Sequence, residues 1–143
     1  MTSFFVAFLL MLSTAASPAP APATQSHVTI DIKSPQALKA GAQGTLQVMF
    51  KPNKGIHINA DPAIDIVPEK NSVIASIGAI VPSKDKHGYV DPSKPVRVSA
   101  AISPSAPKGA QTVKLKVVYF LCSDAEGWCN RDEQTIDVRV TVK

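Results

Sequence analysis

Hydrophobic and polar side chains alternate along much of the chain after residue 27. The alternation occurs in five runs, at residues 28–33, 46–50, 96–100, 113–121 and 136–143. A period of two residues puts every second side chain on the same face of a β-strand, so each run predicts a strand with one buried face. The last two runs are the longest, and we expect them to pair as an antiparallel hairpin.

Residues that form turns separate these runs. Glycine, proline and small polar residues gather at positions 39–44, 51–55, 91–95 and 103–109. No long stretch shows the apolar stripe of a helix. About seven to nine short antiparallel strands with frequent turns predict an all-β fold, and specifically an immunoglobulin-like β-sandwich.

The first 26 residues have a different character from the rest. Residues 4–12 are continuously apolar and are followed by small residues, the layout of a secretory signal peptide that is too short to span a membrane. We therefore expect a signal peptide at 1–17, a Pro/Ala-rich extended linker at 18–26 and one domain at 27–143. Export places the protein in the periplasm or outside the cell, where cysteines pair as disulfides. After signal cleavage we do not expect the chain to span a membrane.

The charge of the chain does not point to a nucleic-acid partner. Fifteen Lys and Arg residues against eleven Asp and Glu give a net charge of +4. The lysines alternate with apolar or turn residues, whereas a nucleic-acid surface normally shows a clustered basic stripe. We therefore interpret them as solvated faces and turns.

The only two cysteines, Cys122 and Cys129, enclose a six-residue loop that contains Trp128. Closing so short a ring is worth only about 2.5 kcal/mol by loop entropy. We expect Cys122 to end the strand at 113–121 and the final strand to begin near Gln134, so that both sulfur atoms lie in an exposed connection. Spacing alone leaves two interpretations open, a redox-active pair and a staple of this connection. Trp128 likewise either shields the disulfide or contacts a partner, or else plugs the end of the sandwich.

Carboxylates surround the two cysteines in the sequence. Asp124 and Glu126 lie between them, Asp132 and Glu133 follow, and Arg131 is the nearest cation. Neighbouring negative charge disfavours a thiolate, so the reduced pair is expected to be a poor attacking group. Together with the absence of a Cys-x-x-Cys motif, this favours a disulfide that a partner attacks over an autonomous oxidase or isomerase.

The stretch at 117–129 resembles a known family. A strand with Tyr three residues before Cys122 leads to an acidic, glycine-containing loop, an aromatic and Cys129, and an alternating strand follows. This arrangement is similar to the periplasmic N-terminal domain of the thiol:disulfide interchange protein DsbD family. The segment at 54–62 is similar to an earlier motif of that family, in which glycine precedes alternating aromatic or His and apolar residues.

The resemblance implies both a fold and a function. It implies an immunoglobulin-like domain whose cysteine pair accepts electrons from a thioredoxin-like or DsbD-type membrane reductase and passes them to periplasmic disulfide-containing proteins. By position, Cys122 and Cys129 carry over as the redox pair, and His57 and Asn59 fall beside it.

The family also has a cap loop that carries an aromatic over the disulfide. The corresponding stretch here is 83–89, in which His87 or Tyr89 is the candidate for shielding the bond.

The residues also offer two rival functions. Cys122 with His57, His87 and Met49 could form a copper site on a β-sandwich, but neither histidine follows the cysteine in the compact ligand loop usual for such sites. We therefore expect no metal and no cofactor. The open alternative is a non-catalytic secreted binding module in which the disulfide only staples a hairpin loop.

Overall fold

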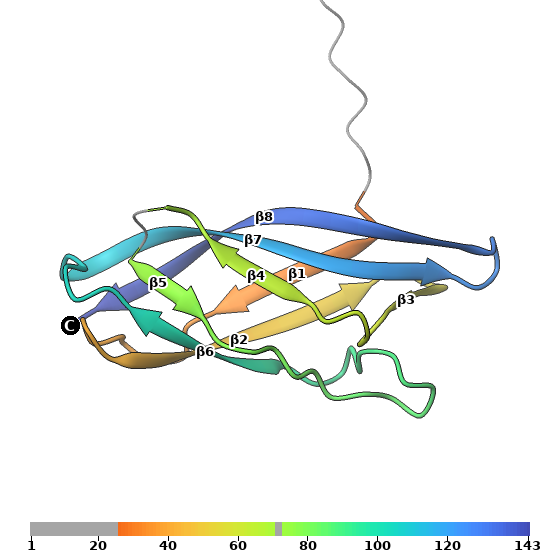
Figure 1. Cartoon of the computed structure of the whole chain (residues 1–143), viewed down its shortest axis with the longest axis horizontal. Helices are drawn as coiled ribbons and strands as arrows, with labels where there is room; N and C mark the ends of the chain where they lie inside the picture. Colours follow the sequence, from red (N-terminus) through yellow and green to blue (C-terminus); the bar gives the residue numbers. More distant parts are fainter. Residues whose placement is uncertain (1–25, 71–72) are drawn as a thin grey trace, which may run out of the picture.

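The computed structural model describes residues 26–70 and 73–143 (Figure 1). The expected signal peptide at 1–17 and all but the last residue of the expected linker lie outside these residues. The described residues form eight strands and no helix, which confirms the all-β prediction, and so they contain no helix able to cross a membrane. The strands are β1 (Val28–Lys33), β2 (Gln43–Pro52), β3 (Ile56–Ile58), β4 (Asp65–Pro68), β5 (Ile74–Ile77), β6 (Val96–Ile102), β7 (Gly109–Ser123) and β8 (Trp128–Val142).

The strands form two antiparallel sheets that pack as a β-sandwich. One sheet has the order β1-β2-β6-β5. In the other, β7 is the central strand, with β8 along one side and β3 and β4 on the other. This order is compatible with an immunoglobulin-like arrangement of an ABED sheet facing a CFG sheet. The finer immunoglobulin-like assignment stays a prediction.

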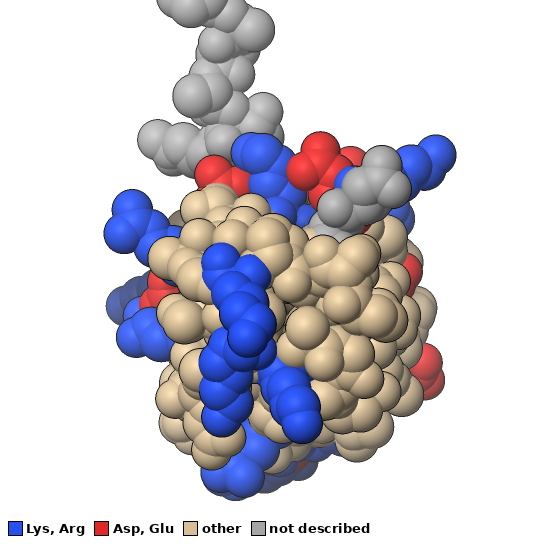
Figure 2. Space-filling view, turned by 90° about the vertical axis from the view of Figure 1, so that its left-hand side faces the viewer, with Lys and Arg blue, Asp and Glu red and all other residues tan. Residues whose placement is uncertain are grey.

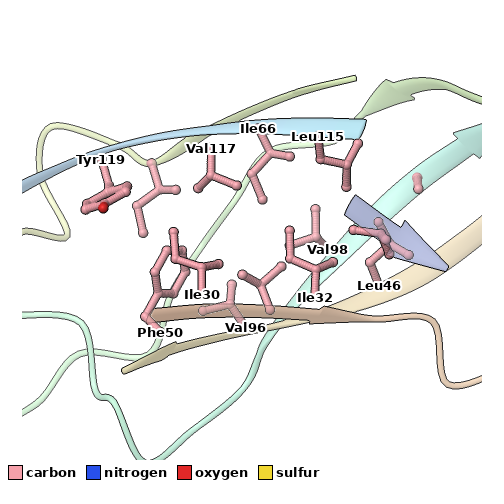
Figure 3. Close-up of a cluster of buried hydrophobic side chains, with 14 of the residues drawn as sticks. Ile30, Ile32, Leu46, Phe50, Ile66, Val96, Val98, Leu115, Val117 and Tyr119 are labelled. Carbon is pink, nitrogen blue, oxygen red and sulfur yellow. The ribbon is translucent and has the colours of Figure 1, made fainter. Parts of the chain in front are cut away.

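The core lies between the two sheets (Figure 3). Ile30 and Phe50 come from the first sheet and Val117 and Tyr119 from β7, and each is at most 6% exposed. The rings of Phe50 and Tyr119 meet edge to face with their centroids 6.3 Å apart. Burying one such aliphatic or aromatic side chain stabilises the fold by about 1.5–3 kcal/mol. The alternation seen in the sequence therefore marks the inner face of each long strand.

The β7–β8 hairpin runs the length of the sandwich. Its two strands pair continuously over fifteen positions, from Gly109 with Val142 to Ser123 with Trp128. The turn of the hairpin and β3 lie at one end of the molecule, and the C-terminus lies at the other (Figure 1). The hairpin thereby carries the cysteine segment to the end of the sandwich.

The hairpin strands are longer than the sequence predicts. We expected β7 to end at Leu121 and the last strand to begin near Gln134, but the strands continue to Ser123 and from Trp128. The reason is that the inner face of β8 becomes polar near this end. Gln134 and Asp132 take inward-facing positions there and hydrogen-bond to a buried tyrosine, so the hydrophobic alternation stops while the strand continues.

Candidate functional site

The two cysteines lie directly opposite each other on the β7–β8 hairpin. The strand register pairs Cys122 with Cys129 and, one step nearer the turn, Ser123 with Trp128. A disulfide joins the cysteines, whose Cα atoms are 4.1 Å apart. Side chains that face each other across an antiparallel pair are close enough to bond, so the register itself brings the sulfur atoms together. The expected long connection from Cys122 to the start of the last strand is therefore replaced by paired strands and a short turn.

The turn between the cysteine strands is short and hydrogen-bonded. The backbone N–H of Gly127 donates to the carbonyl of Ser123 at 2.9 Å, and the N–H of Glu126 donates to the Ser123 hydroxyl at 3.3 Å. Gly127 has a φ of 69°, in the left-handed region that glycine adopts without a steric penalty. These bonds hold the hairpin end in addition to the disulfide.

Both cysteines lie on the outer face of their sheet, but they differ in exposure. Neighbouring residues of a strand point to opposite faces, and Leu121, next to Cys122, is in the core. Cys122 is nevertheless only 8% exposed, whereas Cys129 is an exposed residue. The disulfide thus joins one covered cysteine to one that is open to solvent.

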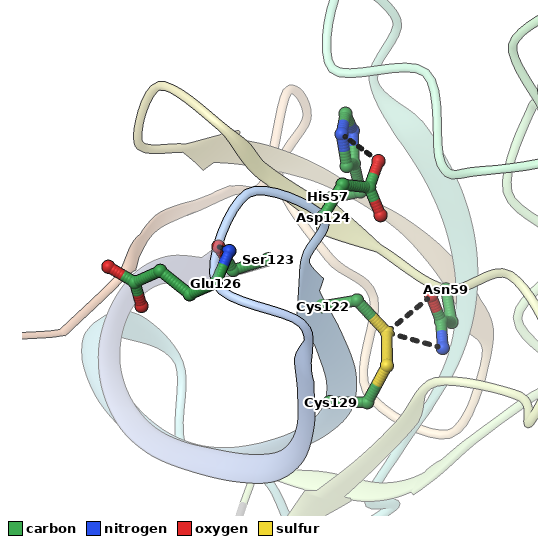
Figure 4. The surroundings of a disulfide bond; sticks show 7 residues. All are labelled: His57, Asn59, Cys122, Ser123, Asp124, Glu126 and Cys129. Atoms are coloured by element: carbon green, nitrogen blue, oxygen red, sulfur yellow. Dashed lines mark hydrogen bonds and ion pairs between the residues drawn. A yellow bond between two sulfur atoms is a disulfide. The ribbon is translucent and has the colours of Figure 1, made fainter.

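β3 and the residue that follows it cover Cys122. β3 pairs with the end of β7, so that His57 lies directly opposite Cys122. Asn59 lies on the same face, and its Nδ2 is 3.6 Å from the Cys122 Sγ (Figure 4). His57 and Asn59, which the sequence resemblance pointed to, are therefore both beside the disulfide.

A loop after the first sheet's β5 strand brings Tyr89, but not His87, to the site. Tyr89 bridges to Asn59 through the backbone, and its ring stacks on that of His57 with centroids 4.6 Å apart. His87 is exposed at the turn of this loop, where its N–H donates to the Asp85 carboxylate at 2.8 Å. Within the described part of the chain, no hydrogen bond, ion pair or ring contact joins His87 to the cysteines.

The disulfide borders a hollow of about 520 Å³ at the hairpin end. Asn59 and Tyr89 line one side of it, and Asp124 and Gly127 of the turn line another. Both cysteines contribute to its surface. The disulfide is therefore reachable from outside through this hollow.

Trp128 borders the same hollow, but its ring packs on the inner face of the sheet. Its register partner is Ser123, which is buried, and its ring lies 5.2 Å from that of His27. The indole Nε1–H donates to the carboxylate of Glu126, and the side chain packs against the core. These contacts favour the interpretation in which Trp128 closes the end of the sandwich.

Carboxylates dominate the charge around the cysteines. Asp61 and Asp124 line the hollow, and the Asp124 Oδ2 is 3.1 Å from the Nε2 of His57. Arg131 forms an ion pair with Glu133, with its Nη2 3.1 Å from the Glu133 Oε2, so its positive charge is balanced by that carboxylate. Negative charge close to a sulfur atom disfavours its ionisation.

A polar network that the sequence did not reveal supports the hairpin from the inner side. The hydroxyl of Tyr119 donates to Asp132 at 2.8 Å and accepts from the side-chain amide of Gln134 at 2.6 Å. The pKa of Tyr119 is raised to about 12, mainly by burial and secondly by the hydrogen bond to Asp132. Gln134 also donates to Ser26 and to the carbonyl of Val28, which ties the start of the domain to the cysteine hairpin. The signal in the sequence that could have revealed this network is the presence of Asp132 and Gln134 at two successive inward-facing positions of β8.

Basic side chains gather at the opposite end of the molecule. Figure 2 faces the end away from the cysteine hairpin and shows a column of Lys and Arg side chains. Lys39, Arg97 and Lys143 line a groove there.

The structure brings together no metal centre in the part that it describes. In residues 26–70 and 73–143, no group of three His, Cys, Asp or Glu side chains is placed to hold a metal ion. Of the ligands considered for copper, Met49 lies on β2 in the other sheet, and His87 lies in the exposed loop.

Comparison with known proteins identifies no family for this chain. No protein-family model matches the sequence, and no curated protein matches it. The resemblance to the DsbD N-terminal domain therefore rests on the residues quoted above.

Proposed function

We propose that this chain is an exported thiol:disulfide interchange module that works with a partner. Its disulfide accepts electrons from a thioredoxin-like or DsbD-type membrane reductase and passes them to disulfide-containing proteins of the periplasm. The observation that carries the proposal is the unequal exposure of the two bonded cysteines beside an open hollow. An exposed cysteine bonded to a covered one favours attack of a thiolate on the exposed residue, with the sulfur of the covered residue as the leaving group.

The proposed exchange proceeds through a mixed disulfide. A thiolate of the reduced partner attacks the Sγ of Cys129, and a bond to that sulfur forms as the Cys122–Cys129 bond breaks. The electron pair leaves on the Sγ of Cys122, which takes a proton. The partner's second thiolate then attacks the partner sulfur in the mixed disulfide and releases Cys129, so that the partner becomes a disulfide and this chain gains two electrons. The same steps in reverse reduce a substrate disulfide.

The small stabilising value of the bond also supports the proposal. The ring closed by the disulfide contains the eight residues from Cys122 to Cys129, which is worth about 2.5 kcal/mol by loop entropy. The turn hydrogen bonds and the strand ladder already hold the same two residues opposite each other. A bond at this position contributes less to folding than one that joins distant segments.

Equilibration against glutathione tests whether the bond is redox-active. We expect a reduction potential well above about −300 mV, below which structural disulfides usually lie. The reduced protein should keep its β-sheet circular dichroism. A potential below that value, together with loss of the folded spectrum on reduction, would favour the stapled binding module.

Trapping tests the partner and the attacked sulfur. Each single-cysteine variant is first converted with Ellman's reagent to its mixed disulfide with thionitrobenzoate, which supplies the disulfide to be attacked. The Cys122→Ser variant, activated at the exposed Cys129, should then capture a thioredoxin that lacks its resolving cysteine and release thionitrobenzoate. The matched Cys129→Ser variant, activated at the covered Cys122, should capture this thioredoxin at least about tenfold more slowly, because a buried sulfur is less accessible. Equal capture by both variants would show that exposure does not select the sulfur, and capture by neither would contradict the exchange function.

Export belongs to the same proposal. It is supported by the apolar run at 4–12 and the small residues after it, and by the disulfide, which persists in oxidising compartments. Fractionation of cells that express the full chain, with mass determination of its N-terminus, tests it. A cytoplasmic protein that retains its first residues would contradict it.

A further inference from the structure

Asn59 is held with its side-chain amide against the covered sulfur. Its Nδ2 and Oδ1 lie 3.6 Å and 3.7 Å from the Sγ of Cys122 (Figure 4). Its backbone N–H donates to the carbonyl of Phe120 at 2.8 Å, and its other side bridges to Tyr89. The backbone of Asn59 is thus fixed between two neighbouring segments, which directs the amide at the sulfur.

The amide matches each protonation state that Cys122 passes through. In the disulfide the sulfur carries no proton, so Nδ2–H is the donor. After reduction, a Cys122 thiol can donate to Oδ1, and a Cys122 thiolate can accept from Nδ2–H. In the described residues, no other side chain hydrogen-bonds to either sulfur atom.

We propose, on the basis of the exchange function above, that Asn59 is a catalytic residue that stabilises the Cys122 thiolate as it leaves. When a partner thiolate attacks the Sγ of Cys129, the electron pair of the broken disulfide moves to the Sγ of Cys122, and Nδ2–H of Asn59 donates to this new thiolate. Exchange is faster when the leaving sulfur is a better thiolate. A hydrogen bond to the charged form favours that form.

The groups around Cys122 show why such a donor is needed. Asp61 and Asp124 line the hollow, and each disfavours a new negative charge on the sulfur. His57, opposite Cys122 on β3, is paired with Asp124 at 3.1 Å and stacked on Tyr89. Asn59 is the neutral donor in this set, and it hydrogen-bonds to the sulfur directly.

Two substitutions of similar volume separate the donor from the shape of the side chain. Asn59→Asp replaces the donating amide with an acceptor, and Asn59→Leu removes both polar atoms. The matched controls are Asn130→Asp and Asn130→Leu, one residue from Cys129, because Asn130 is exposed and pairs with Leu121 rather than with a cysteine.

The first measurement is the rate at which excess dithiothreitol reduces the disulfide, followed by alkylation and mass determination. We expect Asn59→Leu to slow reduction by about threefold to tenfold and Asn59→Asp by about tenfold or more. The first value is smaller than for full loss of a hydrogen bond to a charged group, because the leaving sulfur carries only part of its charge in the transition state. The Asn130 variants should stay within about twofold of the unsubstituted chain. Melting temperatures of the oxidised proteins report whether each variant is folded.

The second measurement isolates the thiolate of Cys122. In a Cys129→Ser background, the midpoint of the pH dependence of iodoacetamide alkylation should rise by about one pH unit for Asn59→Leu and by more for Asn59→Asp. The Asn130 variants should not move it. Folded Asn59 variants with an unchanged rate and an unchanged midpoint would overturn the proposal.

These measurements use small reagents and need no physiological partner. An unchanged rate and midpoint in the Asn59 variants, with trapping of thioredoxin intact, would remove the role of Asn59 and leave the exchange function standing. Slower reduction in the Asn59 variants together with failed trapping of thioredoxin would support the effect of Asn59 on Cys122 and contradict the exchange function.

Discussion

Reduction of the disulfide is expected to leave the domain folded and to lower its free energy of unfolding only modestly. The bond closes a ring of eight residues, for which loop entropy gives about 2.5 kcal/mol. The bond lies at the last pair but one of a ladder of fifteen positions, on the outer face at the end of the core, which reaches Leu121. Because the turn keeps its own hydrogen bonds, the reduced hairpin end should fray over a few residues without loosening the sandwich.

Urea unfolding of the oxidised protein and of the Cys122→Ser, Cys129→Ser double variant measures this difference. We expect a lower midpoint with the same m-value, since the surface exposed on unfolding is nearly unchanged. Hydrogen exchange should quicken near the turn and stay slow in the middle of β7. A loss above about 5 kcal/mol, or an unfolded double variant, would refute the reasoning and identify the bond as a structural staple.

Three further predictions test the surroundings of the bond. The free energy of unfolding should fall by about 2 to 3 kcal/mol between pH 10 and pH 12, because the pKa of Tyr119 is about 12 in the folded state and about 10 in the unfolded state. Tyr119→Phe should abolish this fall, and equal pH profiles of urea stability for the two proteins would contradict the prediction. Trp128→Ala should destabilise the domain by about 2 kcal/mol while dithiothreitol reduces the disulfide at nearly the normal rate, and a large change in that rate would place the ring over the disulfide. Asp124→Asn should speed attack by the negatively charged thiol mercaptoethanesulfonate by about twofold at low salt and not at about 0.5 M salt; an effect that is independent of salt would exclude the charge as its cause.

The long strands could be predicted from the sequence because each buries several side chains at a period of two. The runs at 28–33 and 113–121 coincide with β1 and with most of β7. The short strands β3, β4 and β5 contain three or four residues each, so a periodic pattern cannot develop. Their positions are set by pairing with β6 and β7, which is tertiary information.

The candidate site was predictable only in part for the same reason. The closeness of the two cysteines follows from their spacing, and the resemblance pointed to His57 and Asn59. The contact of Asn59 with Cys122 and the pairing of His57 with Asp124 depend on the register between β3 and β7. A slip of one residue in that register would turn both side chains to the opposite face, and no local pattern fixes it.

The topology of the sheet explains why the two cysteines differ in exposure. Cys122 is on β7, which has β8 on one side and β3 on the other, so residues of β3 lie beside its sulfur. Cys129 is on β8, which is an edge strand of its sheet. In the described residues, the edge of β8 that faces away from β7 pairs only at Val142, which bridges to Leu38 at the far end of the strand. A strand at a sheet edge lacks a neighbour to cover its side chains, whereas a central strand has two. The exposed cysteine and the covered cysteine therefore follow from strand order, and the contact of Asn59 is with the covered one because Asn59 directly follows the strand that covers it.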